Sequence, residues 1–598
     1  MRERSGTLTE HANRRTPTRL TATAVATAAC LVAAPSAAGG AAPVTSPPAP
    51  DEVDGPLQPG TPVVAEATTT DPVATTDQAP ATTETEVREI TVPDVEGAAV
   101  PGDAAEVVAR VHRRSTDHFA LVALTWRPGT APDDVEVQVR THGSRGWSRW
   151  SELHHHAAEG PAPGEESGVL RDGTEPLWVD DADGVQARVL SATGTAPADP
   201  QVVLVDPGGQ SGIVPAVSRP DRARFSVVPA VLRTTSTTAS ATTAASSRPR
   251  LISRRQWGAD PRLRSRCDSP RITNTLQMAF VHHTAGNNHY SRSEAPAIVR
   301  GVYAYHTQGQ GWCDIGYNFL VDRFGRSYVG RAGGPNVAVR GAHSGDYNER
   351  TAGVSLIGNF EKARPTRAMR RGLIRLLAWK LGSFYRGPRT TVRIEGRRFE
   401  KISGHRDAMS TACPGRFVYR WLPRLRERVA SRIGGVQTPI SRKWKRLRAD
   451  GRRIGQPFRG EADSANGGRK TQFGRGWILW NDRPGAHHVY GALYRRYRGW
   501  GLAAGRMGYP RTDAWDIRGH RGRAQTFQRG RIYRTPGNGA VGVWGKVNRR
   551  YRRTGLAAGK LGVPVRDQHR IRRGWAAGFE HGRITWNTST GRTRVRTY

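Results

Sequence analysis

The sequence predicts a multidomain protein in which an α/β domain is preceded by a small β-sandwich domain and followed by β-rich repeats. Strand-like and helix-like segments interleave in residues 251–433, as expected for a mixed β-sheet flanked by helices. Residues 88–210 contain short runs with apolar side chains at every second position. Residues 440–598 repeat with a period of about 53 residues. A length of 598 residues accommodates about three or four folded units.

The N-terminus has the pattern of an export signal, which we assign to residues 1–38. Arg14, Arg15 and Arg19 precede a run of Ala, Thr, Val and Leu at residues 20–34, and small residues follow. The run is short and rich in Thr, so a membrane anchor is the weaker reading. We therefore expect a secreted protein, extracellular or associated with the cell wall, with no transmembrane segment after signal cleavage.

Two stretches have compositions that bury little apolar surface. Residues 39–87 are rich in Pro, Thr, Ala and acidic residues, and residues 233–250 read "RTTSTTASATTAASSRPR". Such compositions predict a disordered spacer and a linker. The β-sandwich domain at 88–210 lies between them, with alternating valines in "VEVQVRTH", and no residue pattern in it indicates a chemistry.

The net charge of +40 is unevenly distributed. Residues 39–233 carry 14 basic and 29 acidic residues, whereas residues 431–598 carry 38 basic and 8 acidic residues. A surface this basic attracts polyanions. In an exported protein, anionic cell-wall polymers are the expected partner rather than nucleic acid, although the arginines could also serve only to keep the repeats soluble.

The secondary structure of residues 251–433 can be predicted from apolar spacing. "MAFVHHTAG" and "AGVSLIGNF" are strand-like, and "YNFLVDRFGRSYVG" predicts a hairpin that turns at Phe324 and Gly325. "EAPAIVRGVYAYHTQ" and "RGLIRLLAWKLGSFY" place apolar residues at helical spacing. Strands and helices therefore alternate along this domain.

The C-terminal region repeats a short motif. "IGQP", "MGYP" and "LGVP" begin at Ile454, Met507 and Leu561, and "GLAAGRMGYP" is nearly copied as "GLAAGKLGVP". A period of this length indicates stacked or propeller-like modules, which bind ligands more often than they catalyse reactions.

Two segments of the α/β domain contain residue types that bind zinc. "FVHHTAG" carries His282 and His283, and "GHRDAMSTACPG" carries His405 and Cys413. A catalytic zinc ion takes three protein ligands of this kind and leaves a position for water. The spacing alone also allows buried packing histidines and an unreactive thiol.

The cysteine count leaves one thiol over. Cys30 lies within the export signal, so Cys267, Cys313 and Cys413 would remain in the processed chain. An odd number of cysteines in an oxidising compartment means that one is free or has another function.

The order of several motifs identifies a family. "SRRQWGAD", "FVHHTAG", "GWCDIGYNFLVDRFGRSYVGRAGG", "GAHSGDYN", "AGVSLIGNF" and "GHRDAMSTACPG" follow one another within residues 251–433. In this order they resemble the type 2 N-acetylmuramoyl-L-alanine amidase domain, which phage amidases and peptidoglycan recognition proteins share. The resemblance implies a zinc-dependent hydrolase of the amide bond between N-acetylmuramic acid and L-alanine in peptidoglycan. The alternative is a non-catalytic peptidoglycan-binding protein, although such relatives characteristically lack the cysteine ligand.

The resemblance also implies roles for individual residues. The Zn²⁺ ligands would be His282, His405 and Cys413, and His282 is preferred to His283 because the family keeps the first histidine. Adjacent residues of a strand also face opposite sides, so geometry allows one ligand from this pair. Tyr317 matches the family's catalytic tyrosine, whose hydroxyl can assist water or an oxyanion.

Six further residues are assigned through the same resemblance. Thr411 stands where other members have Lys or Thr, and we expect it to stabilise the transition state, with a loop contact as the alternative. His306, His343 and Asn348 match residues of the substrate groove, although His306 could instead be a helix C-terminal histidine. Related bacterial members imply a disulfide between Cys267 and Cys313, which would reserve Cys413 for the metal.

The repeats resemble the LGFP repeat of actinobacterial envelope proteins. All three motifs depart from Phe at the third position, while "GAHHVYGALY" and "GAVGVWGKVN" fit the pattern. The resemblance implies cell-wall binding by residues 440–598.

Overall fold

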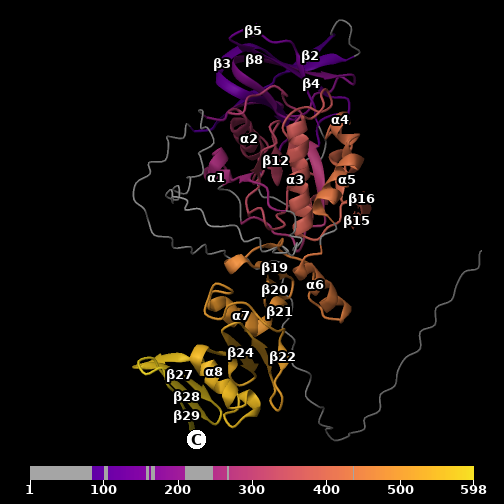
Figure 1. The fold of residues 1–598 in the computed structure, drawn as a ribbon. Helices are drawn as coiled ribbons and strands as arrows, with labels where there is room; N and C mark the ends of the chain where they lie inside the picture. The colour runs from indigo at the N-terminus through magenta and orange to yellow at the C-terminus, as the bar shows by residue number, and fades with distance from the viewer. Residues whose placement is uncertain are drawn as a thin grey trace, which may run out of the picture. The chain divides into compact units, whose positions relative to one another are not determined.

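The computed structural model describes residues 84–99, 105–155, 160–162, 169–208, 247–264, 269–434 and 437–598 (Figure 1). The predicted export signal lies outside the described residues, as do most of the predicted spacer and most of the predicted linker.

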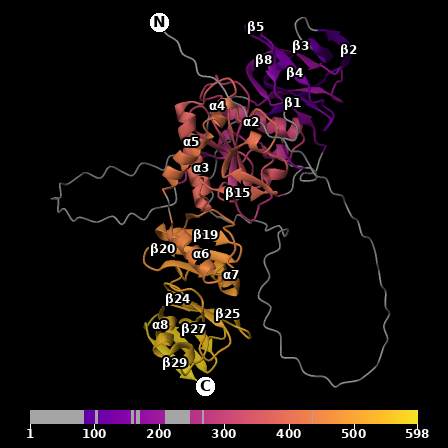
Figure 2. The same cartoon turned by 90° about the vertical axis from the view of Figure 1, so that its right-hand side faces the viewer.

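The N-terminal domain, predicted to be a small β-sandwich, is built from β-strands as expected, and its nine strands belong to one antiparallel sheet. Its central order is β1-β9-β3-β8-β4-β5, and Figure 2 shows β3, β8 and β4 close together. The strands are β1 Glu86–Thr91, β2 Asp94–Ala99, β3 Glu106–Trp126, β4 Glu136–Gly143, β5 Gly146–Trp147, β6 Ser151–Leu153, β7 Asp172–Gly173, β8 Leu177–Ser191 and β9 Gln201–Asp206. The alternating valines Val137 and Val139 are buried in its core, as their spacing predicts.

Strand β9 is buried on both faces. Val202 and Leu204 belong to the core of the β domain, whereas Val203 and Val205 belong to a second apolar cluster that includes Ile298 of the α/β domain. Because both faces are buried, the sequence "QVVLVD" is a continuous apolar run and does not alternate between apolar and polar residues. The outer face of the β-sheet is therefore packed against the α/β domain.

The α/β domain has a mixed six-stranded sheet, as predicted. The strand order is β10-β13-β12-β14-β11-β17, in which only the β12–β13 pair is antiparallel. Its elements are β10 Leu251–Ile252, α1 Arg254–Trp257, η1 Pro261–Arg264, β11 Met278–His283, α2 Ala295–Ala304, η2 Tyr305–Gly309, β12 Phe319–Val321, β13 Ser327–Val329, η3 Asp346–Asn348, β14 Thr351–Leu356, α3 Arg367–Ser383, β17 Ile402–Gly404, η4 His405–Asp407, α4 Arg416–Tyr419 and α5 Leu422–Ile433. A separate hairpin pairs β15 Thr391–Ile394 with β16 Arg397–Glu400.

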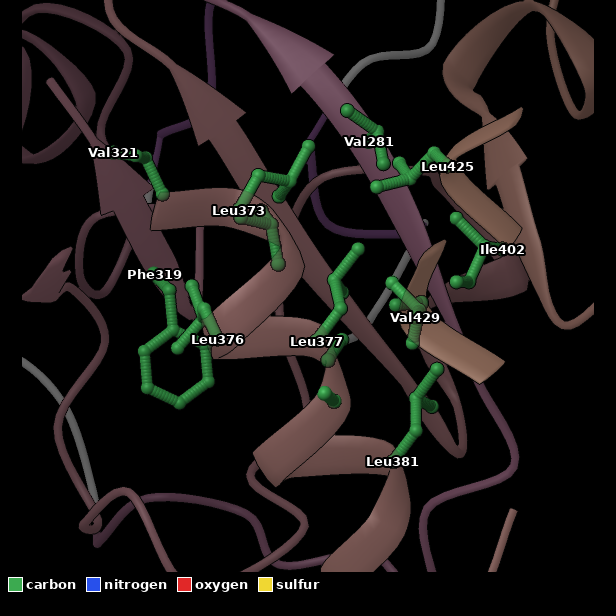
Figure 3. Packing of buried hydrophobic residues seen from close by; sticks show 14 of the residues in the cluster. Val281, Phe319, Val321, Leu373, Leu376, Leu377, Leu381, Ile402, Leu425 and Val429 are labelled. Carbon is green, nitrogen blue, oxygen red and sulfur yellow. The ribbon is translucent and has the colours of Figure 1, made fainter. Parts of the chain in front are cut away.

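Helices α3 and α5 cover one face of this sheet. Thr366 begins α3 by accepting a hydrogen bond from the Met369 backbone amide at 3.0 Å. Side chains three or four residues apart then point to the sheet. Figure 3 shows Leu373, Leu376, Leu377 and Leu381 packed with Val281, Phe319, Val321, Ile402, Leu425 and Val429. This core fixes the position of β11, which carries His282.

The C-terminal region consists of helices and three four-stranded antiparallel sheets. Helix α6 Pro439–Ala449 precedes β18 Ala462–Asp463, η5 Ala465–Gly467, β19 Arg469–Phe473, β20 Gly476–Asn481 and β21 Gly485–Val489. Helix α7 Gly491–Gly499 precedes β22 Trp515–Asp516, β23 Arg523–Thr526, β24 Gly530–Thr535 and β25 Gly539–Trp544. Helix α8 Gly545–Arg553 precedes η6 Leu556–Ala558, β26 His569–Ile571, β27 Gly574–Phe579, β28 Gly582–Asn587 and β29 Thr593–Thr597.

The repeated motif has the same structural role in each module. Its glycines, Gly455, Gly508 and Gly562, have φ values of 81°, 68° and 67°, a left-handed conformation that favours glycine. The proline two residues later pairs with a phenylalanine at the end of a following strand or just after it, as in the bridge between Pro510 and Phe527. The motif is thus a turn that returns the chain to its sheet.

Among the described residues, no helix is both long enough and apolar enough to cross a membrane.

Candidate metal centre

Strand pairing brings His282 and His405 together. β11 and β17 are parallel neighbours, with Val281 opposite Gly404, so His282 and His405 each follow a paired position. Their ring centroids lie 4.5 Å apart, and both side chains are fully buried. The pairing of two short strands therefore joins segments that are far apart in the sequence.

Cys413 reaches the same place through the loop after β17. The Arg406 backbone amide donates to the Cys413 carbonyl at 3.0 Å, which closes the loop. The Asp407 carboxylate accepts hydrogen bonds from the Gly404 amide at 2.8 Å and from the Tyr419 hydroxyl at 2.6 Å. Cys413 Sγ lies 3.8 Å from His282 Nδ1.

The three side chains form a donor set that fits zinc. One ligand atom each from His282, His405 and Cys413 lies within 4.8 Å of the others. Two imidazoles and a thiolate suit Zn²⁺, and three protein donors are the number found in catalytic sites. The His283 backbone amide donates to Cys413 Sγ at 3.3 Å, a contact that favours the thiolate form which metal binding requires.

His283 faces away from this donor set. Its Nδ1 accepts a hydrogen bond from the Phe360 backbone amide at 3.1 Å. Alternation along β11 explains why only the first of the two histidines lies beside Cys413.

His343 lies within hydrogen-bond distance of His282. His282 Nε2 and His343 Nδ1 are 3.2 Å apart, and His343 Nδ1 is also 2.9 Å from Ser344 Oγ. Burial, with a smaller contribution from Arg331, lowers the pKa of His343 to about 3. A neutral His343 can accept a hydrogen bond from the Nε2–H group of His282. The lone pair of His282 is then on Nδ1, the atom nearer to Cys413.

Tyr317 and His306 extend the cluster. The Tyr317 ring centroid lies 5.4 Å from that of His282 and 5.6 Å from that of His306. His306 Nδ1 accepts from the Gly316 backbone amide at 3.2 Å, and its ring stacks on Trp312 at 4.4 Å. Burial lowers the pKa of His306 to about 3, so its imidazole is neutral.

Two of the other predicted residues already have well-defined contacts. Asn348 Oδ1 accepts hydrogen bonds from the amides of His343 and Ser344, at 2.8 and 3.0 Å. Thr411 Oγ1 accepts from the Cys413 amide at 3.0 Å, which is the loop contact considered as the alternative for this residue. That bond holds the cysteine loop, and a role for the hydroxyl in the transition state remains a prediction.

The remaining assignments have different outcomes. Cys267 lies outside the described residues, so its disulfide with Cys313 stays a prediction. Sequence reasoning did not single out Trp312, which packs on His306, or Asp407, which orders the turn after β17. Both lie within motifs of the resemblance, but nothing in their spacing distinguishes them from core residues.

Comparison with known proteins identifies three regions. Residues 61–208 match the family model described as Rv3811 N-terminal galactose-binding domain-like, and residues 273–416 match N-acetylmuramoyl-L-alanine amidase. Residues 454–505 and 507–559 match the LGFP repeat. The N-terminal family was not foreseen from the sequence.

The central region is also similar to curated and solved proteins. A solved structure of Drosophila PGRP-LB has 28% identity and a TM-score of 0.24, covering 29% of this chain and 91% of that one. Peptidoglycan-recognition protein SC2 of Drosophila melanogaster is 34% identical over 165 residues, which are 28% of this chain and 80% of the relative. Peptidoglycan recognition protein 1 of Bos taurus is 34% identical over 171 residues, with the same two coverages. The chain therefore belongs to the family of N-acetylmuramoyl-L-alanine amidases and peptidoglycan recognition proteins, with an N-terminal galactose-binding-like domain and C-terminal LGFP repeats.

Proposed function

We propose that this protein is a secreted zinc-dependent N-acetylmuramoyl-L-alanine amidase that cleaves the bond between N-acetylmuramic acid and L-alanine in peptidoglycan. The observation that carries the proposal is the buried convergence of His282, His405 and Cys413 within a domain of the amidase family. When bound, zinc supplies a Lewis acid for the amide carbonyl and lowers the pKa of water.

The residues around this donor set have separate tasks in the proposed reaction. His343 holds the orientation of His282, and Asp407 and Thr411 hold the loop that carries Cys413. Tyr317 lies beside His282 and offers a phenol that can donate to the developing oxyanion. The set thus combines metal ligation, ligand orientation and a hydrogen-bond donor.

Peptidoglycan is the substrate that the family membership favours. The related proteins are named for recognising it, and we propose the same polymer for this chain. His306 and Asn348 would contact the stem peptide or the adjoining sugar, since both lie in the cluster around Tyr317 and His343.

The repeats would hold the enzyme on the cell wall. Helices α6, α7 and α8 carry basic residues at matching positions, Arg442, Arg495 and Arg549 in one row and Lys445, Arg498 and Arg552 in another. All six side chains are exposed. A surface of this charge favours anionic wall polymers and should lose affinity as salt rises.

Hydrolysis of purified peptidoglycan tests the enzymatic proposal. The zinc-loaded protein is expected to release peptides with new L-alanine amino termini. A chelator should abolish the release, and added Zn²⁺ should restore it. Sedimentation with peptidoglycan but no new amino termini at any zinc concentration would instead identify a non-catalytic binding protein.

A further inference from the structure

The three metal-ligand candidates and two residues beside them are closed off from solvent. His282, His405, Cys413, His343 and Asn348 have relative exposures of 0%. A hydrolase that acts on a polymer needs an open groove, because its substrate cannot enter an enclosed cavity. In this structure, a short segment of the β domain packs beside these side chains.

Residues 160–162 of the β domain, here called the occluding segment, contact the α/β domain at Gly345 and Asn348. The Gly160 carbonyl accepts a hydrogen bond from Asn348 Nδ2 at 2.8 Å and another from the Gly345 amide at 3.2 Å. Pro161 and Gly345 form a parallel β-bridge. The amide of Asn348 that would bind substrate is thus occupied by the protein's own backbone.

Gly160 fits this position only because it is glycine. A Cβ atom there would lie 2.6 Å from the indole of Trp312, and its φ of 121° is one that side chains rarely adopt. Trp312 in turn stacks on His306. The occluding segment is therefore packed directly on Trp312, the residue that stacks on His306.

A docked interface holds the occluding segment in place. The Tyr305 hydroxyl donates to the Thr174 carbonyl at 2.7 Å, and the Arg171 amide donates to the Gln310 carbonyl at 3.1 Å. Arg300 Nε donates to the Pro207 carbonyl at 2.9 Å. Together with the apolar contact of β9, these bonds hold the part of the β domain that follows the segment against α2 and η2.

We propose that the β domain autoinhibits this protein: residues 160–162 occupy the substrate groove, and hydrolysis requires their displacement. That hydrolysis is inhibited rests on the proposed amidase function, whereas closure of the groove can be measured without that function. Substrate competes with Gly160 for Asn348 and with the segment for the face of Trp312. The open state is then a minor population that substrate, or loss of the docking contacts, increases.

Two variants of the full chain displace the occluding segment by different means. Gly160→Ala adds a methyl group against Trp312, whereas Tyr305→Phe removes one docking hydrogen bond without adding bulk. Gly194→Ala is the matched control, because Gly194 is also left-handed, with φ 73°, lies in the same domain, and has nothing within 4 Å of an added Cβ.

Two readouts separate closure from catalysis. In chelator-treated protein, alkylation of the Cys413 thiol is expected to rise about tenfold in Gly160→Ala and about fivefold in Tyr305→Phe, the latter corresponding to one lost hydrogen bond. With zinc, release of L-alanine amino termini should rise in the same order, and Gly194→Ala should match wild type in both assays. Faster alkylation without hydrolysis in any variant would support the closure and overturn the amidase proposal. Alkylation and hydrolysis that stay at the wild-type rate in both opening variants would overturn the closure.

Discussion

At the scale of single residues, position on β11 decides which of two adjacent histidines can bind a metal. His282 lies beside Cys413 and His405, while His283 bonds the Phe360 amide on the other side of the strand. The sequence limited the choice to one of the two, and the family resemblance selected the first. The structure brings that histidine, not its neighbour, into the donor set.

This difference predicts unequal effects of two substitutions. His282→Ala should lower zinc affinity by more than about a hundredfold, because even loss of a residue that orients a ligand costs 10- to 100-fold. His283→Gln should retain zinc and keep an acceptor near the Phe360 amide. Metal content after dialysis against a competing chelator measures both. Equal zinc loss in the two variants would contradict the assignment.

Tyr317 is expected to act on the reaction rather than on the metal. Tyr317→Phe removes only a hydroxyl from a buried ring, so zinc content should stay at the wild-type level. Loss of an oxyanion donor should lower kcat by about 10²- to 10³-fold. Steady-state kinetics on a muropeptide tests this expectation, and an unchanged kcat would remove Tyr317 from the catalytic residues.

The contacts that the sequence could not predict at this scale are long-range ones. Zinc-binding residue types were visible in "GHRDAMSTACPG", but the bond between Asn348 and Gly160 joins residues 188 positions apart. Neither residue has a neighbour in the sequence that signals the other. Long-range packing, rather than local pattern, places Asn348 against the β domain.

At the scale of elements, apolar spacing predicted the central strands and helices well. The hairpin expected to turn at Phe324 and Gly325 is formed by β12 and β13, and Gly325 has a φ of 78°. The helix expected to continue to Gln308 instead ends at Ala304 and is followed by the π-helical turn η2. This turn carries His306 onto Trp312, a stacking contact that helical spacing does not reveal.

Strand β21 contains a buried histidine, His488, and its burial predicts that the first repeat loses stability in acid. Burial lowers the pKa of His488 to about 4, while Asp513 opposes this shift and Lys443 adds to it. Because the folded pKa lies below the usual 6.5, the unfolded chain binds the proton more readily. Stability should therefore be present above pH 6.5 and fall as the pH drops toward 4.

The size of this effect is measurable by substitution. The shift corresponds to about 3 kcal/mol at full titration. His488→Gln should lose less stability than wild type between pH 7 and pH 5 in urea unfolding, and the exposed His581→Gln serves as control. If wild type and His488→Gln lose the same stability between pH 7 and pH 5, His488 is not the cause of the acid sensitivity of this repeat.

The basic helices of the repeats predict retention on the cell wall. Replacing Arg495, Arg498, Arg549 and Arg552 with Gln removes four exposed charges from α7 and α8. If each contacts one phosphate, the slope of log affinity against log salt should fall by about 3 to 4. The matched control replaces four exposed arginines of the α/β domain, Arg371, Arg420, Arg424 and Arg428. Sedimentation with cell walls that is equal in both variants would assign the arginines to solubility alone.

At the scale of the whole molecule, composition and repeats predicted the order of the domains. The α/β class and the repeated modules follow from local periodicity, which can be detected in a single sequence. The docking of the β domain does not follow from periodicity. Strand β9 is buried on both faces, but its sequence is that of an ordinary apolar strand. Closure of the site is a property of that docking and is invisible in the separate domains.

The most direct test of the central claim is product analysis of a defined muropeptide with wild type and Cys413→Ala. We predict that zinc-loaded wild type yields a free lactyl carboxylate on the sugar and a peptide that begins with L-alanine. Cys413→Ala should yield neither above the chelator-treated background, because it removes one of three ligands that converge at the site. Cleavage by Cys413→Ala at the wild-type rate would contradict the account.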